Sequence, residues 1–78
     1  MSEDDVVVNQ QDYEEDVSRF TREERNQLLL DSDWTQLSDV NQRTRYAYVG
    51  YRQALRDLPN HANWPFLNPE DWPKKPNV

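Results

Sequence analysis

The side chains best suited to acid–base or nucleophilic chemistry are few and scattered in this 78-residue chain. His61 is the only histidine, and it has no serine partner or cysteine near it in the sequence. A surface or turn position is therefore the expected role of His61. Cysteine is absent, so the chain has neither a thiolate nucleophile nor a disulfide. We predict that the chain is not an enzyme and that it has no catalytic residue.

The acidic residues are numerous, but their spacing fits no metal site. Asp12, Glu14, Glu15 and Asp16 lack the glycine and the closing glutamate of a calcium-binding loop. The single glycine also excludes a glycine-rich phosphate loop, which needs several positions without a side chain. We therefore expect no metal and no cofactor.

The net charge of −6 is unevenly distributed along the chain. The first sixteen residues hold seven acids and no base, whereas the remaining residues hold eight acids and nine bases. Nucleic acids select basic surfaces, so no nucleic-acid partner is expected. No apolar run is long enough to cross a membrane, and the acidic amino terminus is unlike a secretory signal. We expect a cytoplasmic protein without membrane contact.

The composition divides the chain into two parts. Residues 1–19 are expected to form an acidic flexible tail, because they lack helical periodicity. Residues 20–78 are expected to form one small helical domain, since they hold eight of the nine aromatic residues. A domain of this size is marginally stable alone, so self-association is also compatible with the sequence.

Two helices are predicted within this domain. The first runs from Thr21 to about Asp31, with Thr21 and Glu24 forming a capping box. A tight turn over residues 33–37, capped by Asp33, follows it. The second helix runs over about residues 41–58, with Ser38 or Asp39 as its cap. It ends at Pro59, which disfavours helical geometry in the preceding residue.

The second helix has one continuous apolar stripe. Its members follow each other in steps of three and four residues: Thr44, Ala47, Tyr48, Tyr51, Ala54, Leu55 and Leu58. Gly50 interrupts the helix and indicates either close packing or a weak point. Four arginines fall mainly outside the stripe, where a solvated helix face is the expected interpretation: Arg43, Arg45, Arg52 and Arg56.

The last eighteen or so residues combine prolines with bulky apolar side chains. Pro65, Pro69, Pro73 and Pro76 prevent a regular helix or a central strand, yet Trp64, Phe66, Leu67 and Trp72 are too apolar for a solvated tail. An extended arm that lies across the helices satisfies both constraints. The expected fold is therefore all-α: a small helical hairpin with a proline- and aromatic-rich C-terminal arm packed across it.

Several motifs together resemble the phage tail assembly chaperone family, and they are similar to the C-terminal region of tail fibre assembly proteins. They are DWTQL at residues 33–37, YVGYRQALRDLP at residues 48–59, and the Trp-Pro pairs at residues 64–65 and 72–73. The resemblance covers residues 22–76. The family usually has tryptophan at the position of Tyr48 and phenylalanine at the position of Trp64. Both positions keep an aromatic ring in this chain. The resemblance implies a virus-encoded helper that binds a structural tail or tail-fibre protein in the host cytoplasm, without covalent chemistry.

Four residues are candidates for contact with such a client: Arg52, Arg56, Trp64 and Trp72. Arginine and tryptophan dominate many protein contacts, which favours them for this role. For each aromatic residue, packing inside the domain is an equally good interpretation. Leu28, Trp34 and Leu55 are assigned chiefly to the core.

Two other functions are compatible with the sequence. The chain could remain in the finished particle as a small structural component of the tail or neck, which would place it in the virion. It could also be an acidic viral inhibitor that mimics DNA and binds a host protein. Mimicry requires acids at regular spacing on a rigid surface, whereas nearly half of the acids lie in the expected tail.

Overall fold

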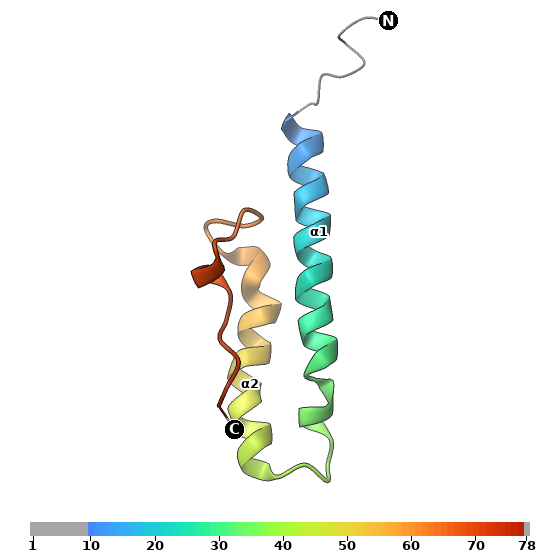
Figure 1. Ribbon diagram of the computed structural model, residues 1–78, viewed down its shortest axis with the longest axis vertical. Helices are drawn as coiled ribbons and strands as arrows, with labels where there is room; N and C mark the ends of the chain where they lie inside the picture. Colours follow the sequence, from blue (N-terminus) through green and yellow to red (C-terminus); the bar gives the residue numbers. More distant parts are fainter. Residues whose placement is uncertain (1–9, 78) are drawn as a thin grey trace, which may run out of the picture.

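The computed structural model describes residues 10–77 and shows two antiparallel α-helices joined at one end (Figure 1). Helix α1 spans Gln10–Asp31 and helix α2 spans Gln42–Asp57. The 3₁₀ helix η2, Asp33–Gln36, lies in the connection between them. There is no strand in this range, so the predicted all-α hairpin is confirmed. None of the helices described is long and apolar enough to cross a membrane.

Helix α1 begins much earlier than the sequence predicts. The expected start and capping box at Thr21 are wrong, because Thr21 lies in the middle of the helix and is buried. Residues 10–19, which were expected to be part of a flexible tail, are helical. The rest of the expected tail, residues 1–9, lies outside the described residues.

Local and tertiary contacts account for the early start of α1. Asp12 lies in the first turn, where a carboxylate interacts favourably with the positive end of the helix dipole. The ring of Tyr13 stacks on the ring of Phe66, with 5.9 Å between the centroids. A helix whose first turns contact another segment does not depend on local propensity alone.

Helix α2 matches its predicted range to within a residue at each end. Its cap is Asn41, whose side-chain oxygen accepts a hydrogen bond of 2.7 Å from the amide of Arg43. The prediction of Ser38 or Asp39 as cap is therefore wrong. After Asp57 the chain continues into the 3₁₀ helix η3, Leu58–Asn60, which contains Pro59.

The core is small and is centred on the predicted stripe of α2. Leu55 is fully buried, and Tyr48 and Leu58 are nearly so. Leu28 of α1, which was assigned to the core, is half-buried, whereas Ala54 of the stripe is exposed. The stripe is thus confirmed for its three largest buried members.

The structure overturns the core assignment of Trp34 and decides between the two alternatives for Gly50. Trp34, assigned to the core, is 52% exposed, and its ring lies 6.2 Å from the ring of Tyr48. The 3₁₀ helix that carries Trp34 lies at the end of the hairpin, where no third helix of residues 10–77 covers it (Figure 1). Gly50 is a weak point and not a site of close packing, because nothing lies within 4 Å of the position a Cβ would occupy.

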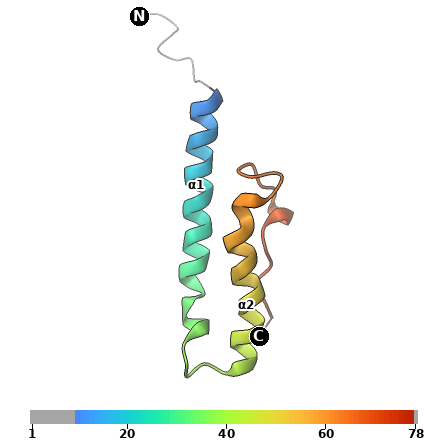
Figure 2. The ribbon, with the colours of Figure 1, turned by 180° about the vertical axis from the view of Figure 1, so that it is seen from behind.

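The C-terminal segment turns at the far end of α2 and runs back beside it, as both views show (Figures 1 and 2). It contains the 3₁₀ helix η4, Pro69–Asp71. The Trp64–Pro65 peptide bond is cis. The hydroxyl of Thr21 in α1 donates a hydrogen bond of 3.1 Å to the carbonyl of Pro65. This hydrogen bond anchors the turn before η4 to α1.

Candidate functional site

Arg52, the first predicted contact residue, lies within the hairpin. Its Nη1 donates hydrogen bonds to the Leu29 carbonyl at 2.8 Å and to the Ser32 hydroxyl at 2.7 Å. Its Nη2 lies 2.7 Å from Oδ1 of Asp33, and the side chain is only 14% exposed. This guanidinium therefore joins α2 to the end of α1. The expectation that Arg52 lies on a solvated helix face, outside the apolar stripe, is wrong.

Arg56 lies one turn further along α2 and is exposed. Its Nη2 donates a hydrogen bond of 3.0 Å to the side chain of Gln53. No ion pair holds it among residues 10–77. Of the two predicted arginines, Arg56 is the one whose charge faces solvent.

Trp64 and Trp72 are both half-buried on the C-terminal segment. The guanidinium of Arg22 in α1 lies 5.6 Å from the centroid of the Trp64 ring, within the range of a cation–π contact. Trp72 directly follows η4, and its amide donates to the carbonyl of Pro69 at 3.4 Å. The Trp64 indole thus has a partner within the domain, whereas the contact given for Trp72 is made by its main chain.

The structure does not assemble the four predicted residues into one site. Arg52 and Arg56 belong to α2, and no hydrogen bond, ion pair or ring contact within the described range joins either of them to Trp64 or Trp72. Their role in partner binding stays a prediction.

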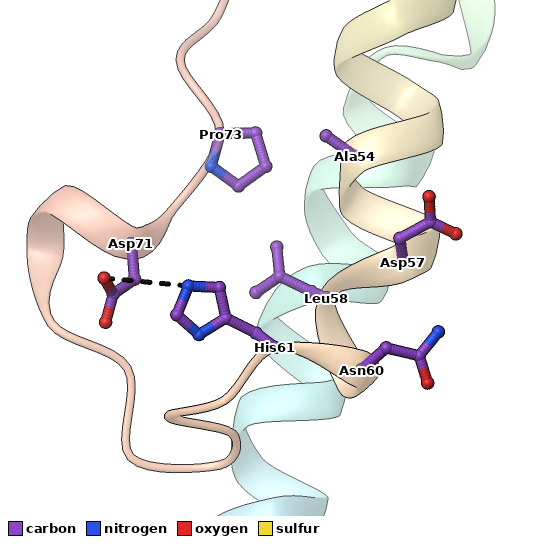
Figure 3. Close-up of a pocket in the computed structure, with 7 residues that line it drawn as sticks. All are labelled: Ala54, Asp57, Leu58, Asn60, His61, Asp71 and Pro73. Carbon is purple, nitrogen blue, oxygen red and sulfur yellow. Dashed lines mark ion pairs between the residues drawn. The ribbon is translucent and has the colours of Figure 1, made fainter.

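A hollow of about 430 Å³ lies between the end of α2 and the returning segment (Figure 3). Its floor is apolar, with Leu58 and Pro73 from opposite sides, and His61 and Asp71 lie beside them. Nε2 of His61 is 3.8 Å from Oδ1 of Asp71, while Nδ1 accepts a hydrogen bond of 3.0 Å from the amide of Asn63. His61 is exposed in a turn, as predicted.

Asp71 organises this turn through its carboxylate. Its Oδ2 accepts hydrogen bonds of 2.9 Å from the Asn63 side chain and from the Asn68 amide. The amide of Asp71 in turn donates a hydrogen bond of 2.9 Å to the Asn68 carbonyl, so the two residues hold the start of η4 in both directions. The bond from Asn63, then that from Asn68, and to a smaller extent His61, lower the pKa of Asp71. These groups stabilise a local turn, and no serine or cysteine lines the hollow.

Sequence reasoning missed the most prominent surface feature, which is the number of exposed large apolar side chains. Only three hydrophobic residues are buried, whereas eight large ones among the described residues are exposed: Tyr13, Phe20, Leu30, Trp34, Leu37, Tyr46, Val49 and Phe66. Helical register could have shown that Phe20 and Leu30 are exposed, because neither shares the face of α1 that carries Thr21 and Leu28. Leu30 lay within the predicted helix, whereas placing Phe20 on a helix face required the earlier start of α1.

Comparison with known proteins gives one match, to a family model described as phage tail assembly chaperone protein, over residues 18–77. Searches of curated proteins and of solved structures found no match. The matched range includes most of α1, all of α2 and the returning C-terminal segment. It agrees with the resemblance seen in the sequence over residues 22–76. The chain belongs to the phage tail assembly chaperone family.

Proposed function

We propose that this protein binds an unassembled tail or tail-fibre structural protein non-covalently and keeps it soluble until assembly, acting in the cytoplasm of the infected host. Membership of the chaperone family supports a phage tail protein as the general class of partner. The observation that carries the proposal is the excess of exposed over buried large apolar side chains. Exposed apolar surface of this kind is typical of proteins that bind other proteins.

Five of the eight exposed side chains come from the end of the hairpin where its elements meet. Leu30 lies in the last turn of α1, Trp34 in η2, and Leu37 directly after η2. Tyr46 and Val49 lie in the first two turns of α2. We call these five residues the tip surface; Leu30 and Tyr46 lie on the sides of α1 and α2 away from Leu28 and Tyr48, so the tip surface surrounds the end of the hairpin.

The tip surface offers apolar contact area on a rigid support. The connection beneath it is hydrogen-bonded internally: the Thr35 hydroxyl donates to the Ser32 carbonyl at 2.6 Å, and both residues are buried. Among the described residues no buried side-chain polar atom lacks a hydrogen-bond partner. Exposed rings and leucines on such a support can cover apolar surface of a client without reorganising the hairpin.

Co-expression tests the proposal. The chain is expressed with each tail and tail-fibre protein encoded by the same phage, and the soluble fraction of each client is measured with and without it. We expect one client to become more soluble and to co-purify with the chain. The double variant Leu37→Ser/Tyr46→Ser should lose both effects while keeping its helical circular dichroism.

A control for the introduced serines is Asn60→Ser/Ala62→Ser, which places two serines at exposed positions at the opposite end of α2 without removing a large apolar side chain. This control should retain client binding. If no tail protein changes in solubility or binds, the proposed function is wrong. Recovery of the chain from purified virions in the same amount as a tail protein would instead identify a structural component.

A further inference from the structure

A second exposed surface lies on α1, away from the tip surface. On the helix, Phe20 lies seven residues after Tyr13, and the two glutamates lie three and four residues from both Phe20 and Gln27, so all five share one face. With one ring of the C-terminal segment they form what we call the aromatic–acidic face: Tyr13, Phe20, Glu23, Glu24 and Gln27 of α1, and Phe66.

The aromatic rings of this face are open to solvent. Phe20 is 73% exposed, the largest fraction among the exposed apolar residues. It lies two helical turns from Tyr13, about 10 Å along the helix axis. Tyr13 and Phe66 stack on each other and are each exposed by about half. A hollow of about 410 Å³ is lined by Phe20 and its three polar neighbours on the helix.

The charge of this face is negative. Glu23 and Glu24 are exposed, and neither has an ion pair in the described part of the chain. The three arginines nearest in sequence have other partners: Arg19 lies 2.8 Å from Asp16, Arg22 lies over the ring of Trp64, and Arg25 donates to the side chain of Asn26. A partner on this face therefore contacts aromatic rings and two carboxylates, and neither carboxylate is paired with a cation of the described residues.

Charge decides which occupant fits. A second copy placed face to face would bring glutamates against glutamates, which is unfavourable. The chain's own first residues include Glu3, Asp4 and Asp5, so they would be repelled as well. A segment with lysine or arginine next to large apolar side chains satisfies both features, because the cation can pair with a carboxylate and lie over a ring.

We propose that the aromatic–acidic face binds a basic, apolar segment of the client tail protein. This inference rests on the proposed function and adds to it the chemistry of the segment that is recognised. The tip surface covers apolar area on the client, whereas this face selects positive charge. A client contact of this kind weakens as the salt concentration rises, because exposed charges are screened.

The experiment uses an array of overlapping peptides that covers the tail and tail-fibre proteins of the same phage. The full chain is applied to the array, and dissociation constants are then measured for the peptides that bind. We expect bound peptides to contain lysine or arginine beside bulky apolar residues. Phe20→Ser and the charge reversal Glu23→Lys/Glu24→Lys should each weaken binding about tenfold or more.

The chain offers a closely matched control in Glu14→Lys/Glu15→Lys. This pair lies on the same helix and changes the net charge by the same amount, but it falls outside the series of the aromatic–acidic face. We expect it to change affinity by less than about threefold. Circular dichroism of all three variants should retain the helical signal of the parent chain.

The outcomes separate the two proposals. Equal weakening by both charge reversals would overturn the aromatic–acidic face as a site, since only overall charge would then matter. Selection of acidic or neutral peptides, or full binding by Phe20→Ser, would also overturn it and leave the proposed function standing. Co-expression that finds no client at all would refute the proposed function, and this inference with it.

Discussion

Nη2 of Arg52 lies 2.7 Å from Oδ1 of Asp33, so an ion pair joins the middle of α2 to the connection between the helices. The same guanidinium also donates to the Leu29 carbonyl and the Ser32 hydroxyl. The Arg52 side chain thus connects α2 to three consecutive parts of the chain: the last turn of α1, the residue that follows it, and η2. This geometry makes Arg52 a structural residue whatever its part in client binding.

Arg52→Ala should lower the free energy of unfolding by about 2 kcal/mol, because charge-assisted hydrogen bonds in a largely buried position are lost. Arg56→Ala, one turn away and exposed, should change it by less than about 0.5 kcal/mol. Urea unfolding followed by circular dichroism measures both values. Equal stability of the two variants would show that the Arg52 network does not hold the hairpin together.

Gly50→Ala should raise the stability of the protein. Gly50 lies inside α2, and the space around its Cα is open, so a methyl group meets nothing within 4 Å. Alanine is favoured over glycine in a helix interior by about 1 kcal/mol. Thermal unfolding should therefore show a higher midpoint for the variant. A lower midpoint would show that this position of α2 does not accommodate a methyl group.

Thr21→Val should loosen the anchor of the C-terminal segment on α1. The variant keeps the shape of the side chain but removes the donor to the Pro65 carbonyl, at a cost of about 1 kcal/mol. Tryptophan fluorescence reports on the neighbouring Trp64, and its emission should shift towards that of a solvated indole. Thr44→Val is the control, since Thr44 is a half-buried threonine of α2. An unchanged spectrum in Thr21→Val would argue against this anchor.

The turn held by Asp71 should be lost in acid. Hydrogen bonds from Asn63 and Asn68 lower the pKa of Asp71 below its ordinary value of 3.8. A carboxylate whose pKa is lowered by folding contributes stability above that ordinary value, and the contribution disappears as the pH falls through the lowered pKa. The amide resonances of residues 63 and 68 should therefore move together at a pH below 3.8. Asp71→Asn should abolish this transition; its persistence would assign it to another group.

The helical pair was predictable because its signals are local. The stripe of α2 repeats at the helical period, and Pro59 marks where the helix stops, so both the range of α2 and the burial of Leu55 follow from the order of residues. The motifs that resemble the chaperone family are also a property of the sequence, and the match over residues 18–77 confirms them.

The tertiary structure decided what depends on residues distant in the chain. Thr21 has the residue pattern of a helix cap, yet α1 starts at Gln10, and a carbonyl 44 residues further on accepts the hydroxyl hydrogen bond. Trp34 is apolar enough for a core, but a hairpin of two helices has too few layers to cover it. Arg52 is polar and belongs by composition on the surface, yet carbonyl, hydroxyl and carboxylate groups from the other side of the hairpin surround it. Periodicity specifies which side of a helix is apolar. The residues that pack against that side depend on how the chain folds back on itself.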